Sequence, residues 1–243
     1  IVEQVAQKKP RTDWDCTYIP HGIPEEKFYP IDEKDEEFKQ LTGFKRQLTK
    51  GKDYDFIVFW NNRNIRTDLP EVVSNLCPDY DVIFSHNKLE DKQLNFIYNI
   101  ADIQVNIASN EGFGLGTAEA VMAGTPIIVN VTGGLQDQCG FELNGKHVGY
   151  EDYREIVSFH DRDKWEHNAD LTWGEWVKPI WPACRSVQGS VPTPYIFDDR
   201  PRWEDLGTRI REWYETPKEK RTSFGKKGRE WMLKEEVGMS CKN

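Results

Sequence analysis

The sequence predicts an α/β fold with a doubly wound parallel sheet. Strand-like and helix-like segments alternate between residues 56 and 131. The run Phe56–Trp60 is continuously apolar, which is typical of a strand covered on both faces. A glycine-rich turn at residues 112–116 follows the strand-like run Ile103–Ile107 and opens a helical run. Unpaired amides and the helix dipole favour an anion at such a turn.

The remaining elements follow from periodicity and from the glycines and prolines that end each run. Residues 16–20 are interpreted as a short strand, and Glu25–Asp35 as a charged connector. Residues 141–192 predict a Trp-rich, partly irregular insertion, whose tryptophans are expected to form a satellite core. Helices are expected at Glu36–Leu48, Asp68–Leu76, Glu90–Ile100, Thr117–Ala123, Pro201–Tyr214 and Lys218–Glu236, and further strands at Val82–Phe84, Pro126–Val131 and Pro194–Phe197.

Composition narrows the class of protein. The 243 residues carry a net charge of −9, which argues against nucleic acid as a bulk partner. There is no apolar run of membrane-spanning length, and Ile1–Pro10 lacks the apolar core of a signal peptide. This segment is interpreted instead as the tail of a helix without an initiator Met, so a piece of chain is expected upstream. The five cysteines are scattered without any C-x-x-C pair, which disfavours a zinc site or a disulfide framework and favours the cytoplasm.

Two glutamates bracket the glycine-rich turn. Glu111 precedes it, and Glu119 lies inside the first helical turns. A carboxylate repels phosphate but accepts hydrogen bonds from vicinal hydroxyls, as in a ribose or a hexose. The loops 61–66, 85–89 and 108–116 are all expected at the carboxyl edge of the sheet, where α/β folds bind ligands. The pattern therefore predicts a pocket for a sugar–phosphate–nucleoside ligand.

The motif resembles that of a known family. Glu111-Gly-Phe-Gly-Leu115, Glu119-Ala120, Ala123–Ile127 and Gly133-Gly134 resemble the signature of glycosyltransferase family 4, the group 1 transferases. Tyr18–Ile23 is similar to that family's interdomain hinge, and Asn62–Asn64 to its first donor-contacting loop. The likeness spans roughly residues 15–135 and 193–235, and it implies the Rossmann-like, donor-binding C-terminal half of a GT-B fold.

The resemblance also implies a domain plan. Residues 1–20 would be the tail of the N-terminal domain and the hinge. Residues 21–235 would be the nucleotide-sugar-binding domain, with the insertion at about 141–192. Residues 236–243 would start the C-terminal crossover segment, and the acceptor-binding N-terminal domain would be missing.

Site roles are carried over residue by residue from the resemblance. Glu111 would contact the transferred sugar near its anomeric carbon and stabilise positive charge there, as the catalytic residue. Glu119 would bind the ribose hydroxyls. Arg63 and Arg66 would neutralise the diphosphate. The segment Gly112, Phe113, Gly114, Leu115, Gly116 and Thr117 would hold the donor sugar and phosphates, with Phe113 shaping the turn, and Asn87, Lys88 and Leu89 would contact the base.

The implied activity is that of a retaining glycosyltransferase. It would move a sugar from a UDP-, GDP- or ADP-linked donor to a saccharide or another hydroxyl acceptor, with no cofactor and no metal. A nucleotide-sugar-binding domain without transfer activity, or a GT-B epimerase, remains an alternative. A phosphorylase would need a lysine that holds pyridoxal phosphate, and no such motif is evident.

Some residues depart from the family's pattern. The lysine expected after Arg63 is replaced by Thr67 or Asp68, and we expect that about one βα unit, roughly 30 residues, is absent between Arg66 and Thr67. The glycines at 112, 114 and 116 do not complete a dinucleotide-binding fingerprint, which would need glycine in place of Thr117 and an acidic residue near Asn130. The sequence therefore disfavours an NAD-dependent enzyme.

Two other features of the sequence are expected to be structural or incidental. The two D-x-D triplets, at residues 13–15 and 161–163, do not follow buried strands and are interpreted as chance. His21 is expected to be structural at the hinge.

Overall fold

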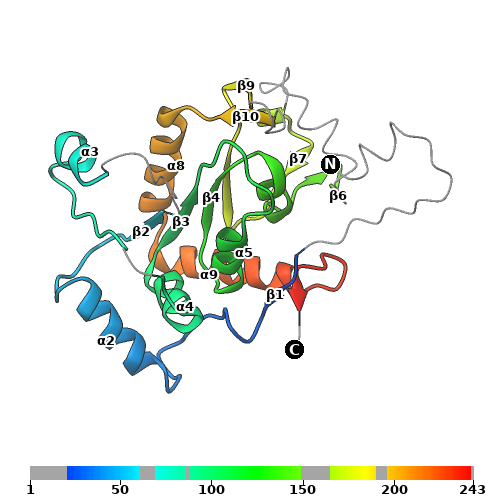
Figure 1. The fold of residues 1–243 in the computed structure, drawn as a ribbon. Helices are drawn as coiled ribbons and strands as arrows, with labels where there is room; N and C mark the ends of the chain where they lie inside the picture. Colours follow the sequence, from blue (N-terminus) through cyan, green and yellow to red (C-terminus); the bar gives the residue numbers. More distant parts are fainter. Residues whose placement is uncertain (1–20, 61–68, 86–87, 149–164, 190–195, 242–243) are drawn as a thin grey trace.

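The structure, a computed structural model, describes residues 21–60, 69–85, 88–148, 165–189 and 196–241. A four-stranded parallel sheet lies at its centre, in the order β2-β3-β4-β8 (Figure 1). This arrangement confirms the predicted α/β class. The strands are β2 (Val58–Trp60), β3 (Ile103–Asn106), β4 (Ile127–Asn130) and β8 (Val177–Ile180).

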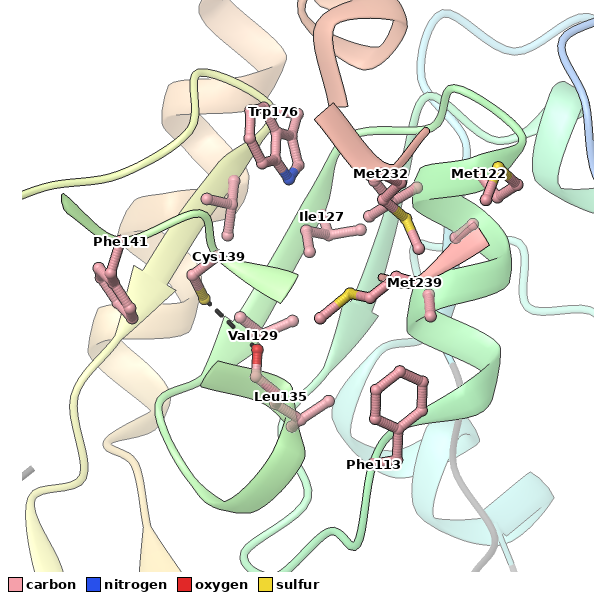
Figure 2. Close-up of a cluster of buried hydrophobic side chains, with 14 of the residues drawn as sticks. Phe113, Met122, Ile127, Val129, Leu135, Cys139, Phe141, Trp176, Met232 and Met239 are labelled. Atoms are coloured by element: carbon pink, nitrogen blue, oxygen red, sulfur yellow. Dashed lines mark hydrogen bonds between the residues drawn. The ribbon is translucent and has the colours of Figure 1, made fainter. Parts of the chain in front are cut away.

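Helices bury both faces of this sheet, as a doubly wound arrangement requires. Along β4 the side chains alternate. Ile128 packs in one hydrophobic cluster with Trp213 of α8 (Trp203–Glu215), whereas Ile127 and Val129 pack in another with α5 (Leu115–Met122). Figure 2 shows Ile127 and Val129 pointing into this second cluster. The alternation follows from the period of two along a strand.

The described residues contain four further helices. They are α2 (Phe38–Leu48), α3 (Leu69–Leu76), α4 (Asp91–Ile100) and α9 (Lys218–Met232). The 3₁₀ helix η1 spans Gly133–Gln138. Helix α9 approaches the end of α5 so closely that a side chain at Gly225 would overlap the carbonyl group of Gly124. No helix among the described residues is both long and apolar enough to cross a membrane.

Small sheets flank the central one. β5 (Glu142–Leu143) pairs with β6 (Lys146–His147) and β7 (Leu171–Thr172). β1 (Ile23–Pro24) pairs in parallel with β11 (Ser240–Cys241). β9 (Cys184–Gln188) and β10 (Ile196–Arg200) form an antiparallel hairpin. The strand predicted at Pro194–Phe197 overlaps β10 at Ile196 and Phe197, β10 continues to Arg200, and residues 194–195 lie outside the described residues.

One predicted strand is wrong. Val82–Phe84 has no strand conformation, and Val82 and Ile83 are exposed. A three-residue apolar run forms a strand only where a neighbouring strand supplies hydrogen bonds, and β2 is the outer strand on this side of the described sheet. The expectation of an absent βα unit between Arg66 and Thr67 lies outside the described residues.

The predicted insertion needs correction as well. β8 lies inside residues 141–192 yet belongs to the central sheet. Trp165, Trp176 and Trp181 are buried in the main hydrophobic cluster, so they form core, not a separate satellite. Trp203, at the start of α8, is 79% exposed.

Candidate functional site

A pocket of about 820 Å³ opens at the carboxyl ends of β2 and β3. This is the edge at which parallel sheets bind ligands. A second cavity, of about 740 Å³, lies between α2 and α9 at the other end of the sheet. Only the first contains part of the glycine-rich motif. Its lining comprises His21, Trp60, Asn106, Ile107, Ala108, Ser109, Asn110, Glu111, Phe113, Gly114, Leu115 and Gly116.

Glu111 is half-buried in this pocket, and its backbone is held by the segment Gly133–Gly134. Its carbonyl oxygen accepts a hydrogen bond from the amide of Gly134 at 3.2 Å. Its carboxylate accepts one from the amide of Gly112 at 3.1 Å. Gly133 has a φ of +49°, and a side chain there would overlap the Glu111 carbonyl oxygen. The glycine pair therefore lets two loops pack backbone against backbone.

The glycine-rich turn forms the start of α5. Gly114 caps this helix with a φ of +87°. The Gly114 carbonyl accepts hydrogen bonds from the amides of Thr117 and Ala118 at 2.9 and 3.1 Å. The amides of Leu115 and Gly116 belong to the first turn, where a helix has no carbonyl to pair them with, and both residues line the pocket. This geometry suits an anion.

Two other members of the motif, Phe113 and Thr117, are turned inward. The Phe113 side chain is buried, with its ring 5.0 Å from that of His21, as suits a residue that shapes the turn. Gly112 is exposed. The Thr117 hydroxyl is fully buried and accepts a hydrogen bond from Asn106 at 3.0 Å, so it links β3 to α5. Its contact with a diphosphate stays a prediction that this conformation does not favour.

Glu119 lies one turn further along α5 and is half-buried. The Tyr98 hydroxyl donates a hydrogen bond to its Oε2 atom at 2.8 Å. Burial raises the pKa of Glu119 above its ordinary value, and the Tyr98 hydrogen bond opposes that rise. Tyr98 is 1% exposed and packs edge-on against Phe28 and Phe59. Glu119 is not part of the pocket lining.

The structure places few of the residues predicted in the basic loop and in the base-binding loop. Arg63, Arg66 and Asn87 lie outside the described residues, so their roles stay predictions. Lys88 is exposed and Leu89 is half-buried just before α4, and neither lines the pocket. In the part of the chain that the structure describes, no group of three or more His, Cys, Asp and Glu residues could hold a metal ion.

Several site residues were missed by sequence reasoning. Trp60 ends β2, lines the pocket and is 47% exposed, although it reads only as the last residue of an apolar strand. Asn110 lines the pocket and donates a hydrogen bond to the carbonyl of Phe197 at 2.9 Å, which brings in the β9–β10 hairpin. The position of Trp60, as the last residue of a strand at the ligand-binding edge, was the available sequence signal. No local pattern connects Asn110 with Phe197.

Comparison with known proteins shows which family part of the chain resembles. Residues 75–158 match the sequence model of the family described as glycosyl transferases group 1. A stretch of 82 residues is 33% identical to a D-inositol 3-phosphate glycosyltransferase of Xylanimonas cellulosilytica, covering 34% of this chain and 20% of that protein. The chain thus spans a fifth of the length of this relative.

One solved structure supports the observed fold. The chain superposes on a sucrose-phosphate synthase from Thermosynechococcus elongatus with a TM-score of 0.52 at 15% identity, covering 94% of this chain and 50% of that one. The C-terminal domain of a group 1 family glycosyl transferase from Francisella tularensis gives a TM-score of 0.35 at 18% identity, covering 58% of this chain and 86% of that one. At this identity the first match shows the fold alone. The part of the chain at residues 75–158 is therefore similar to the group 1 glycosyltransferases.

Proposed function

We propose that this chain is the donor-binding part of a retaining glycosyltransferase that uses a nucleoside-diphosphate sugar. The observation that carries the proposal is the pocket that Glu111 shares with the first turn of α5. A carboxylate can accept hydrogen bonds from sugar hydroxyls, and the adjacent helix N-terminus can bind an anion. The two together suit a sugar linked to a diphosphate. Glu119, further along α5, would bind the ribose. The cytoplasmic location stays a prediction.

We infer the following reaction from the family resemblance and these assignments. The bond between the anomeric carbon and the diphosphate oxygen breaks, and the acceptor oxygen forms a new bond on the same face of the sugar. The acceptor proton passes to the leaving phosphate. Glu111 would stabilise the positive charge on the sugar ring, while the amides of Leu115 and Gly116 would stabilise the departing phosphate. Arg63 and Arg66 would supply the remaining positive charge, and the proposal needs no metal.

The second candidate is a domain that binds a nucleotide sugar without transferring it. It rests on the same observation, because the pocket that Glu111 shares with the first turn of α5 would bind a nucleotide sugar whether or not transfer follows. The two candidates share the donor site and differ only in turnover. A transfer or hydrolysis assay with the same nucleotide sugars therefore separates them.

Thermal unfolding tests the donor site. UDP, GDP and ADP would each be compared with UDP-glucose, GDP-mannose and ADP-glucose. A ligand present at 100 times its Kd adds about 2.7 kcal/mol to the free energy of unfolding, or a rise in Tm of about 5–10 °C for a domain of this size. Failure of every nucleotide to raise the Tm would overturn the proposal.

Variants assign the two glutamates. Glu119→Ala should abolish the shift with every nucleotide, because the ribose is common to all. Glu111→Ala should keep the shift with the free nucleotide and remove only the additional shift that the sugar gives. Glu142→Ala is the matched control, because Glu142 is exposed on β5 and outside the pocket. The same shift in all three variants would contradict these roles.

A further inference from the structure

We propose that Asp199, on the β9–β10 hairpin, is a positioning residue that fixes the backbone of Glu111 through Thr132. The inference rests on the proposed function, since it concerns the residue that would contact the donor sugar. It gives the hairpin a role in the donor site. Neither the glycine-rich motif nor the match over residues 75–158 includes this hairpin.

The Asp199 side chain is held by two partners. Asp199 is 4% exposed. Its carboxylate accepts hydrogen bonds from Nε and one terminal nitrogen of Arg185 at 2.5 and 3.0 Å, which joins β10 to β9. It also accepts a hydrogen bond from the Thr132 hydroxyl at 2.8 Å. A buried carboxylate with charge-assisted bonds of this kind has one favoured position.

The backbone of Asp199 binds both loops that leave the sheet at the pocket. Its amide donates a hydrogen bond to the carbonyl of Ser109 at 2.7 Å, in the loop after β3. Its carbonyl accepts one from the Asn130 side chain at 2.8 Å, at the end of β4. The same Asn130 amide group donates to the carbonyl of Ala108 at 3.0 Å. One residue of the hairpin therefore ties the two loops together.

The connection from Thr132 to Glu111 is short. Gly133 and Gly134 come directly after Thr132, and the Gly134 amide binds the Glu111 carbonyl at 3.2 Å. Side chains on either glycine would overlap the 111–113 backbone, so the two segments lie in direct contact. Because close-packed backbone transmits displacement, a shift of Thr132 moves Glu111. In a site built for a sugar, a small misplacement of this carboxylate weakens binding.

An ion pair elsewhere in the fold provides the control. Asp102 lies just before the amino end of β3, and its carboxylate accepts a hydrogen bond from Arg221 at 2.7 Å. The Asp102 carboxylate also has a second partner, as that of Asp199 does, because it accepts a hydrogen bond from the backbone amide of Ile57 at 2.9 Å. Neither Asp102 nor Arg221 lines the pocket at the carboxyl edge. Asp102→Asn therefore weakens a comparable pair and leaves the donor site unchanged.

Two variants test the link in the full chain. Asp199→Asn weakens the bonds to Arg185, and Thr132→Val removes only the hydroxyl that joins Thr132 to Asp199. Backbone amide NMR signals report the position of Glu111 without any ligand, because the Gly112 and Gly134 amides both bind Glu111. Both signals should shift in the two variants and stay in place in Asp102→Asn. If Asp199→Asn fails to fold, Thr132→Val carries the test alone.

Calorimetric titration adds the functional readout. For each protein the Kd of UDP, GDP or ADP is divided by the Kd of the matching nucleotide sugar. We expect this ratio to fall about tenfold in Asp199→Asn and Thr132→Val, as the loss of one good hydrogen bond to the sugar implies. It should stay unchanged in Asp102→Asn. A merely structural role for Asp199 predicts the same ratio in all variants.

The outcomes separate the two proposals. Unmoved Gly112 and Gly134 signals, or an unchanged ratio in a chain that binds nucleotides, overturn the positioning role. Shifted signals in a chain that binds no nucleotide or nucleotide sugar overturn the proposed function and leave the link from Asp199 to Glu111 standing.

Discussion

Replacing Tyr98 with phenylalanine removes one buried hydroxyl and keeps the ring. The ring contacts with Phe28 and Phe59, at 6.0 and 5.5 Å between centroids, remain. What is lost is the hydrogen bond to the Glu119 carboxylate. The substitution therefore isolates the contribution of a single donor to the residue that we assign to the ribose.

The magnitude follows from the environment of Glu119. A hydrogen bond to a charged group contributes about 1.5–3 kcal/mol, and the lower end applies here because Glu119 is only half-buried and water can replace the donor. A loss of about 1.5 kcal/mol lowers the Tm of a chain of this size by about 3–6 °C. Nucleotide affinity should fall as well, because the carboxylate is no longer held in one orientation.

The effect should depend on pH in a defined direction. Burial raises the pKa of Glu119 above 4.5, its ordinary value, so between that value and the raised one the folded chain binds a proton that the unfolded chain has released. The contribution of Glu119 to the free energy of unfolding therefore falls as pH rises through this window. Removing the Tyr98 hydroxyl raises the pKa of Glu119 further, because the hydrogen bond from this hydroxyl favours the charged carboxylate.

Thermal unfolding of Tyr98→Phe at about pH 7.5 and about pH 4.5 measures this effect. The loss in Tm should shrink by about half at the lower pH, because a hydrogen bond to a neutral carboxyl is weaker than one to a carboxylate.

Tyr29→Phe is the matched control for this measurement. Its hydroxyl donates to Glu37 near α2, a contact that raises the pKa of Tyr29 to about 12, and it lies away from the pocket. The control should lose Tm without losing nucleotide affinity. A Tyr98→Phe chain with unchanged nucleotide affinity, or with a larger loss of Tm at low pH, would refute the reasoning.

Two further substitutions probe the pocket. Gly133→Ala should cost about 2–3 kcal/mol in urea unfolding, because its side chain would overlap the Glu111 carbonyl oxygen at a positive φ. Gly145 also has a positive φ, of +74°, but open space around it, so Gly145→Ala should cost only about 1 kcal/mol. Equal losses of stability in the two variants would contradict the packing argument. Trp60→Ala should weaken nucleotide-sugar binding about tenfold through lost stacking area. The 79%-exposed Trp203, replaced by alanine, should leave binding unchanged, and equal affinities in both variants would exclude Trp60 from the site.

The part of the fold that sequence predicts well is the part with strong local signals. The segment from Ile103 to Val131 combines buried apolar runs with a glycine turn and a helix that ends at Gly124, and the structure places β3, α5 and β4 there. Helix ends marked by Gly or Pro fall within a few residues of their predicted positions. Val82–Phe84 had the apolar composition of a strand but no described partner to pair with.

Missed features depend on contacts between residues far apart in the chain. β8 was hidden because Lys178 and Pro179 interrupt its apolar run. Tyr98 reads only as one apolar position of an amphipathic helix, and its partner Glu119 is 21 residues away. Thr132 and Asp199 are 67 residues apart. No periodicity encodes such pairs, because the sheet brings them together only when it assembles.

The proline in β8 has a consequence for how the protein behaves at high concentration. In the ladder to β4, the carbonyls of Trp176 and Ile180 accept the hydrogen bonds, so the backbone of Pro179 faces outward. Proline has no amide hydrogen to offer there, and the Pro179 carbonyl already accepts a hydrogen bond from Arg209 of α8 at 3.3 Å. A strand from a neighbouring molecule therefore finds neither a donor nor a free acceptor at this position. This edge of the sheet resists the strand-to-strand growth that leads to aggregation.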